Sequence, residues 1–119
     1  MKSSQSLLVI LVLTPILFLS NNLISNVKDI QHNKKITIKL NTIQCDMCIE
    51  KIAEAIKSVE GVVKTKVNLN KKTATITFNA DLTNKSEIEK TITSAGYDAN
   101  NKTADSESYK KLSSCCKRP

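Results

Sequence analysis

The spacing of apolar residues between positions 35 and 100 limits the fold of this chain more than any other feature of its sequence. Apolar and polar residues alternate in KKITIKL (34–40), VVKTKVNL (62–69) and TATITF (73–78). This alternation is typical of strands with one buried face, so three strands are predicted, and YDAN (97–100) is predicted as a short fourth. The side chains expected to face inward are Ile36, Ile38, Leu40, Val63, Val67, Leu69, Ala74, Ile76 and Phe78.

Two further segments carry apolar residues at the three- and four-residue spacing of an amphipathic helix. Asp46 is the expected N-cap of the first helix, and Gly61 ends it. Ser86 and Glu89 match a capping box at the start of the second helix, which ends at Gly96. The residues expected to form the buried stripes are Ile49, Ile52, Ala53 and Ile56 in the first helix, and Ile88, Ile92 and Ala95 in the second.

The resulting order is strand, helix, strand, strand, helix, strand. It predicts one α+β domain at residues 35–100, in which a four-stranded antiparallel sheet carries both helices on one face. Only 3% of the residues are aromatic and there is no Trp, so the core must consist mainly of Ile, Val, Leu and Ala.

The N-terminal segment is expected to direct export rather than to join the fold. One Lys precedes an apolar run from Leu7 to Leu19, which is shorter than the about 20 residues that span a bilayer comfortably. Residues 1–25 are therefore predicted as a signal peptide, with an uncleaved anchor through residues 7–19 as the alternative. Residues 26–34 are predicted as a linker. The domain is then expected to be periplasmic or secreted, either free or anchored to the membrane.

The chain is basic, with 18 basic and 11 acidic side chains and a formal charge of +7. The basic residues are scattered over all predicted elements instead of lying beside aromatic side chains, so no nucleic-acid partner is expected. An acidic docking partner or an anionic membrane surface is compatible with the charge. We expect a monomer.

Cys45 and Cys48 stand where the first helix is predicted to begin. The positive end of the helix dipole stabilises thiolates there, and the thiolate is the form that binds metal or attacks a disulfide. Soft thiolates select ions such as Cu(I) and Zn(II), and the same argument includes Hg(II). Two sulfurs leave the coordination of an ion open, which suits transfer to another ligand.

Three other uses of the cysteines stay open from the residues alone. A structural disulfide suits an exported chain, although so short a loop loses little entropy on closure. A thioredoxin-like thiol–disulfide oxidoreductase uses the same spacing, but that fold typically places a cis-proline opposite the pair and an aromatic residue before it. The only prolines here are Pro15 and Pro119, and Ile43 and Gln44 precede Cys45. A closed zinc site would use all four cysteines.

The segment from ITIKLNTIQCDMCIEKIAEAI to SAGYDA, within residues 35–100, resembles the heavy-metal-associated domain family. The features that carry the resemblance are Cys45 and Cys48, the helix register that follows them, the Gly61–Val62 turn, the Val67–Leu69 strand end and the Gly96–Tyr97 loop. It implies a ferredoxin-like βαββαβ sandwich, with Cys45 and Cys48 as metal ligands and Tyr97 in the loop that flanks the site.

The chain departs from the family at two positions before the cysteines. Thr42 stands where the family usually has Gly, and Ile43 where it has a buried Met. Ile43 is expected to fill the same space, while Thr42 suggests a stiffer approach to the site. Met47, between the two ligands, is expected to point to solvent, and Tyr97 to shape the site or to lie at the edge of the core with its hydroxyl in water.

Among members of the family, an exported, free-standing domain most resembles the periplasmic mercury-binding proteins, which pass Hg(II) to a membrane transporter. Copper chaperones share the motif and the Gly-Tyr loop. The resemblance implies a metal carrier without enzymatic activity, whose cargo is Hg(II) or Cu(I) and less readily Zn(II) or Cd(II). It also implies a membrane metal transporter as the partner.

Residues 101–119 are polar and predicted as a flexible tail, which ends in a second cysteine pair, Cys115 and Cys116. The fifteen residues from Asn100 to Cys115 can span up to about 50 Å when extended, so the tail can reach back to Cys45 and Cys48. The two tail cysteines are candidate auxiliary ligands in a three- or four-thiolate site. Ion relay, a protecting disulfide and no role at all are the alternatives.

Overall fold

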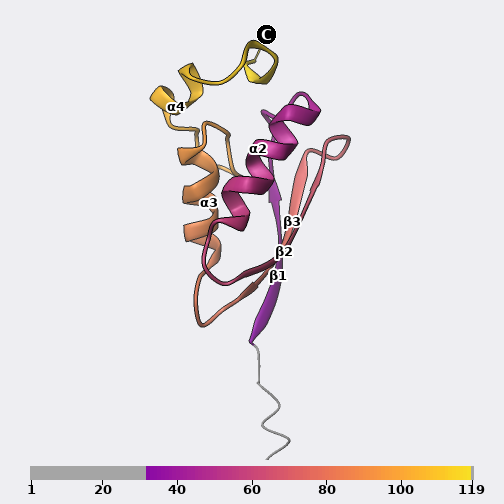
Figure 1. Ribbon diagram of the computed structural model, residues 1–119, viewed down its shortest axis with the longest axis vertical. Coiled ribbons are helices and arrows are strands. Elements are labelled where there is room, and N and C mark those ends of the chain that lie inside the picture. The colour runs from indigo at the N-terminus through magenta and orange to yellow at the C-terminus, as the bar shows by residue number, and fades with distance from the viewer. Residues whose placement is uncertain (1–31, 119) are drawn as a thin grey trace, which may run out of the picture. The chain divides into compact units, whose positions relative to one another are not determined.

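The computed structural model describes residues 32–118, and Figure 1 shows the order of their elements. These are β1 (Asn33–Lys39), α2 (Asp46–Lys57), β2 (Val62–Asn68), β3 (Thr73–Asn79), α3 (Lys85–Ser94), α4 (Ser106–Lys110) and the 3₁₀ helix η2 (Ser114–Cys116). The predicted order from the first strand to the second helix is confirmed. The signal peptide, the anchor and most of the linker were predicted in residues 1–31 and lie outside the described residues. β1 begins at Asn33, inside the predicted linker.

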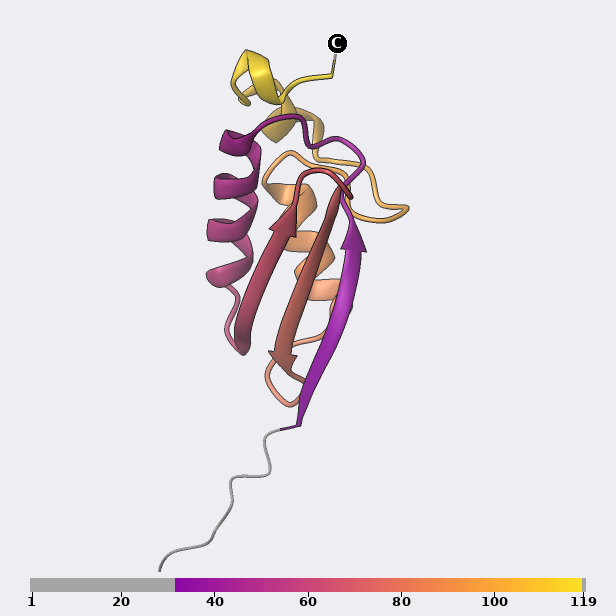
Figure 2. The same ribbon diagram turned by 90° about the vertical axis from the view of Figure 1, so that its right-hand side faces the viewer.

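The described sheet has β3 at its centre, paired antiparallel with β1 on one side and β2 on the other. The helices α2 and α3 lie together on one face of the sheet (Figure 1, Figure 2). The predicted α+β architecture with both helices on one face is therefore confirmed. The side chains that fill the space between sheet and helices, all fully buried, include Ile38, Ile52, Ile56, Ile76, Ile88 and Ile92.

The fourth strand predicted at residues 97–100 is not confirmed, because the described sheet has three strands. The backbone N–H of Asn100 donates to the carbonyl of Lys39, and the side chain of Asn100 accepts from the N–H of Lys39, both at 2.9 Å. Asn100 then turns the chain away from β1 with a φ of +52°. One residue thus satisfies both backbone groups of Lys39, and no ladder continues from it.

The prediction that Val63 faces inward is wrong. A β-bulge lies between Val62 and Lys64, where the two residues pair with consecutive residues of β3. The extra residue shifts the alternation, so that Val62 packs against the core and Val63 is 60% exposed. From Lys64 onward the lysines of β2 point away from the helices.

Both predicted helix N-caps are also wrong. Cys45, in extended conformation, is the N-cap of α2, and Asp46 is its first residue. The N-cap of α3 is Asn84, whose side-chain oxygen accepts from the backbone N–H of Glu87 at 3.0 Å. The capping box expected from Ser86 and Glu89 does not form, because Ser86 lies inside α3 and the nearly buried carboxylate of Glu89 is bound by Lys102 and Asn100.

Residues 101–118 differ from the flexible tail that their polar composition predicts. They belong to the same compact unit as the sheet, and they contain α4 and η2. Leu112 is 8% exposed and Cys116 is 1% exposed, so both join the hydrophobic core. Figure 1 and Figure 2 both show this segment, in yellow, at the end of the domain where the chain enters α2. Burial of these two side chains helps to dock a segment that is otherwise polar.

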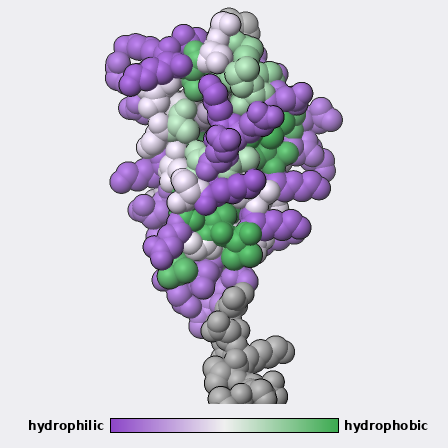
Figure 3. Space-filling model, in the orientation of Figure 1, coloured by the Kyte–Doolittle hydropathy of each residue, from purple (hydrophilic) through white to green (hydrophobic). Residues whose placement is uncertain are grey.

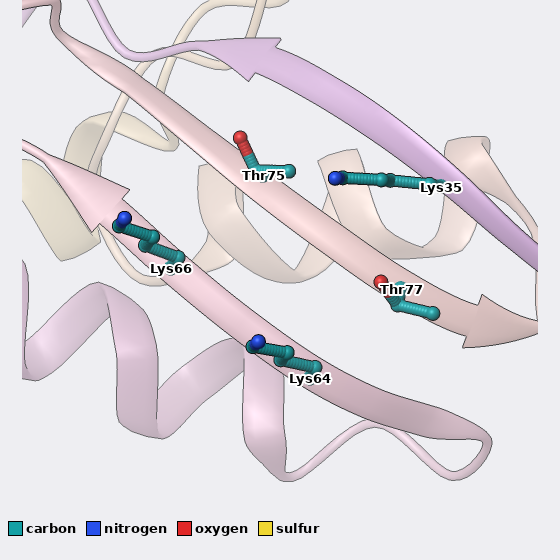
Figure 4. Close-up of a pocket in the computed structure, with 5 residues that line it drawn as sticks. All are labelled: Lys35, Lys64, Lys66, Thr75 and Thr77. Atoms are coloured by element: carbon teal, nitrogen blue, oxygen red, sulfur yellow. The ribbon is translucent and has the colours of Figure 1, made fainter.

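The face of the sheet opposite the helices is polar. Figure 4 shows a shallow hollow on this face, lined by Lys35, Lys64, Lys66, Thr75 and Thr77. Figure 3 shows the domain in the orientation of Figure 1. Hydrophilic residues cover most of this side as well, and hydrophobic residues appear in small separate areas. Within the described range, no helix is both long enough and apolar enough to cross a bilayer.

Candidate metal centre

The two cysteines predicted as metal ligands lie at the N-terminal end of α2. The backbone N–H of Cys48 donates to the carbonyl of Cys45 at 3.1 Å, which closes the first turn over the loop. Ile43 is fully buried, as expected of the residue that replaces the family's Met. The hydroxyl of Thr42 accepts from the backbone N–H of Asp98 at 3.1 Å. The loop is thereby fixed to the core and to the segment that follows α3.

All four cysteines of the chain come together at this point, and all four are free thiols. The Sγ of Cys45 lies 3.3 Å from that of Cys48, 3.3 Å from that of Cys115 and 3.8 Å from that of Cys116. The Sγ atoms of Cys115 and Cys116 are 3.9 Å apart. Cys45 is therefore the centre of the cluster, and the pair predicted to be auxiliary lies beside it.

The two loop cysteines differ in how readily they ionise. Hydrogen bonds from the thiol of Cys48, then from the thiol of Cys115, then from the backbone N–H of Cys48, lower the pKa of Cys45 to about 7. Burial raises the pKa of Cys48 to about 11, and its hydrogen bonds to other sulfurs act in the same direction. Cys45 is thus the loop cysteine that ionises first, near neutral pH, while the buried Cys48 stays a thiol beside it.

The tail cysteines also stay protonated beside that thiolate. The hydrogen bond of Cys115 with Cys45 raises the pKa of Cys115, and burial raises the pKa of Cys116. The four groups interact closely, so their protons leave as a coupled set rather than one residue at a time. An ion that binds several of these sulfurs must displace several protons.

Tyr97 is fully buried, so its hydroxyl does not lie in water as one of the two expectations had it. The hydroxyl has no hydrogen-bond partner among the described residues. Burial, and then the neighbouring sulfurs of Cys116 and Cys48, raise its pKa. The neutral phenol therefore lies beside the sulfurs of the two buried cysteines, Cys48 and Cys116. Met47 is 46% exposed, in agreement with the expectation that it points to solvent.

Several residues that hold the tail were not identified from the sequence. Asp105 caps α4 by accepting from the backbone N–H of Ser108 at 2.8 Å, and its own N–H donates to the carbonyl of Thr93 at 2.9 Å. The hydroxyl of Tyr109 accepts from the backbone N–H of Arg118 at 2.8 Å. The available signal was Asp105 three positions before Ser108, together with the three-residue spacing of Tyr109 and Leu112.

Two other groups of polar residues offer no comparable site. His32, the only histidine of the chain, is exposed and lies 3.0 Å from the carboxylate of Asp81. The hollow on the open face of the sheet is lined by ammonium and hydroxyl groups (Figure 4). Among the described residues, a group of three or more metal-binding side chains occurs at Cys45, Cys115 and Cys116. Cysteine sulfurs gathered in this way, once deprotonated, are ligands for soft or borderline metal ions.

Comparison with known proteins points to the same segment. The model of the heavy-metal-associated domain matches residues 37–98. The mercuric transport protein periplasmic component of Salmonella typhi is 34% identical over 62 residues, which cover 52% of this chain and 68% of that protein.

Solved structures with a similar fold include oxidized MerP from Ralstonia metallidurans CH34, with a TM-score of 0.56 and 28% identity. That alignment covers 57% of this chain and 94% of the other. A copper binding domain from HMA7, a P-type ATPase, gives a TM-score of 0.54 and 29% identity, and covers 56% and 89% of the two chains. Segment 101–118 extends beyond the residues matched by the family model.

Proposed function

The chain belongs to the heavy-metal-associated domain family, and we propose that it is an exported carrier of a soft metal ion. In this proposal Cys45 and Cys48 bind one Hg(II) or Cu(I) ion, which then passes to a membrane transporter or another thiolate partner. The ion is cargo, and no reaction is catalysed.

The observation that carries the proposal is the meeting of two free sulfurs, 3.3 Å apart, at the N-terminal end of α2. Cys45 is partly exposed and has a pKa lowered to about 7, so a soft ion meets a ready ligand there. Cys48 lies behind it in the core and loses its proton when the ion binds.

Export and transfer are supported by the relatives and by the predicted leader. The Salmonella typhi relative is named as a periplasmic component of mercuric transport. The similar copper binding domain is part of a P-type ATPase. The apolar run from Leu7 to Leu19 matches the central region of a secretory signal, which supports export. A membrane metal transporter is therefore the partner that we propose, with a monomeric carrier.

The choice of ion rests on sulfur chemistry. Thiolates favour soft ions, and the similar proteins include both a mercury and a copper protein. Zn(II) and Cd(II) also bind thiolates, and we rank them behind Hg(II) and Cu(I). Competition among the four ions for the reduced protein orders them directly.

The experiment is a titration of the full, reduced chain with Hg(II) or Cu(I) in the presence of a competing ligand. We expect tight binding, with loss of at least about a hundredfold in affinity when Cys45→Ser and Cys48→Ser are combined, because no paired loop thiolates remain. Met47→Leu is the matched control: it removes the neighbouring thioether, is expected to leave affinity within about twofold and keeps the helix start intact. Unchanged affinity in the double serine variant would exclude this site.

A thiol–disulfide oxidoreductase is the second candidate, and one observation favours it. A lowered pKa at an accessible cysteine beside a buried one also suits attack on a disulfide. It predicts catalytic turnover in an insulin reduction assay. A carrier predicts at most one stoichiometric thiol reaction per chain.

A further inference from the structure

We infer that the C-terminal segment supplies a third and a fourth sulfur ligand, so that the ion is held by a site closed by the chain itself. The ligands are Cys115 and Cys116, in addition to Cys45 and Cys48. The inference rests on the proposed function, because it concerns the same ion. It changes the coordination of that ion from an open pair of thiolates to a set of three or four.

The first support is that the tail cysteines are positioned by contacts other than those between sulfurs. Leu112 is 8% exposed and anchors the segment in the core. Asp105 joins α4 to the end of α3 through its hydrogen bond to the carbonyl of Thr93. The backbone of Arg118 is bound by the hydroxyl of Tyr109, and its guanidinium lies 5.5 Å from the centre of that ring. These contacts lie on both sides of η2 in the sequence.

A second support links the tail to the metal loop through Asp98. The backbone N–H of Asp98 donates to the hydroxyl of Thr42, and its carboxylate accepts from the backbone N–H of Ala104 at 2.8 Å. The same carboxylate lies 3.9 Å from the guanidinium of Arg118. Thr42 stands where the resembling family usually has Gly, and here its side chain takes part in holding the loop and the tail together.

Gly96 allows the close approach of α4. Its φ is +100°, and a Cβ atom built on it would lie 3.1 Å from the backbone of Ser108 and Tyr109. The end of α3 and the start of the tail therefore pack backbone against backbone. This contact fixes the direction from which Cys115 and Cys116 reach the loop.

The spacing of the sulfurs fits an ion with three or four ligands. With metal–sulfur bonds of about 2.3 Å, neighbouring sulfurs of a tetrahedral site are about 3.8 Å apart, whereas two sulfurs in a linear site are about 4.6 Å apart. The sulfur distances here are 3.3, 3.3, 3.8 and 3.9 Å. The pair in the loop is closer than a linear site requires, and the sulfur of Cys116 stands near the tetrahedral distance from those of Cys45 and Cys115. The sulfurs of Cys45, Cys115 and Cys116 all lie within 4.8 Å of one another, and Cys48 joins this group through its contact with Cys45.

The burial of the four sulfurs suggests how an ion enters and leaves. Cys48 and Cys116 are buried, Cys45 is partly exposed and Cys115 is exposed. An incoming thiolate of a partner therefore meets Cys115 and Cys45 first. Exchange starts at these outer sulfurs, while Cys48 and Cys116 keep the ion until the tail detaches.

The test loads the full, reduced chain with one equivalent of Hg(II) and counts the sulfur ligands by X-ray absorption spectroscopy. We expect three or four sulfurs in the unaltered chain and two in Cys115→Ser/Cys116→Ser. Because a tethered ligand acts at millimolar effective concentration, transfer of Hg(II) to excess dithiothreitol should be about tenfold faster or more in that variant. Ser113→Ala/Ser114→Ala, which alters the same turn without removing sulfur, should match the unaltered chain.

If the double variant loosens the tail, Cys115→Ser alone is the alternative variant, because it keeps the buried Cys116. This single variant should bind the ion with one sulfur ligand fewer than the unaltered chain. Equal sulfur counts and equal transfer rates in the unaltered chain and both cysteine variants would overturn the inference. In that case the proposed function stands as long as Cys45→Ser/Cys48→Ser abolishes tight binding. Tight binding that survives loss of Cys45 and Cys48 overturns the proposed function instead.

Discussion

Cys45 is both the central sulfur of the cluster and the cysteine that ionises most readily. Its sulfur lies within 3.8 Å of the three others, and it is the one cysteine of the four whose pKa is lowered. The sequence predicted Cys45 and Cys48 as a pair of ligands. It could not rank them, because the ranking depends on burial of Cys48 and on the hydrogen bond between the sulfurs of Cys45 and Cys115, which is 70 positions away.

The four cysteines should differ in how readily they are alkylated. In the reduced chain, Cys45 should react with iodoacetamide before the other cysteines, with a midpoint near pH 7, because its folded pKa is about 7 against an ordinary value of 9.0. Cys48 should react last, since burial raises its pKa to about 11. Mass spectrometry of the digested protein measures each site separately.

The control is Cys115→Ala, which removes the second largest of the interactions that lower the pKa of Cys45. The midpoint for Cys45 should move upward in that variant. A midpoint near pH 9 for Cys45 in the unaltered chain contradicts the assignment. The lowered pKa also means that the folded reduced chain gains stability from Cys45 above pH 9 and loses that gain as the pH falls through 7.

Helices and strands were predictable in kind but not in their ends. The two hydrophobic periods identify β1, α2, β2, β3 and α3 because each element must bury one apolar face. The caps were misplaced because several neighbouring polar residues can fill the N-cap position. Asn84 occupies it, whereas Glu89 is bound by Lys102 at 2.9 Å and by the side chain of Asn100 at 2.6 Å. The β-bulge at Val63 could not be predicted, because the alternation of apolar and polar residues in this segment does not show where an extra residue is inserted.

At the scale of elements, Gly96 should control the docking of α4. Gly96→Ala places a side chain at a positive φ and against the backbone of Ser108, so we expect a loss of about 1–3 kcal/mol in the free energy of unfolding. Hydrogen exchange of the amides in residues 106–116 should become faster as α4 detaches. Urea denaturation and exchange mass spectrometry measure the two effects.

Gly61→Ala is the matched control. Gly61 also has a positive φ, and a Cβ there would lie 2.7 Å from the Cβ of Leu82, beyond the C-terminal end of α2. The variant should lose stability without a specific increase in exchange at residues 106–116. If tail exchange in Gly96→Ala is no faster than in Gly61→Ala, Gly96 does not seat α4.

At the scale of the whole domain, residues 32–118 form an α+β domain of the heavy-metal-associated family, with segment 101–118 folded onto the loop that carries Cys45 and Cys48. The family's fold and the position of the loop followed from residues 35–100. The docking of the tail did not follow, because its polar composition gives low apolar density and its contacts join residues far apart in the sequence. Leu112 and Cys116 bury the apolar side chains of the tail in the core, and the hydrogen bonds of Asp98 and Tyr109 orient its backbone.

The most direct test at this scale is the position of the ion in the whole folded chain. Crystals of the full, reduced protein loaded with one equivalent of Hg(II) should give a single anomalous peak, with the ion about 2.3–2.5 Å from the Sγ atoms of both Cys45 and Cys48. A peak elsewhere in the molecule, with the sulfurs of Cys45 and Cys48 bound to no metal, contradicts the account.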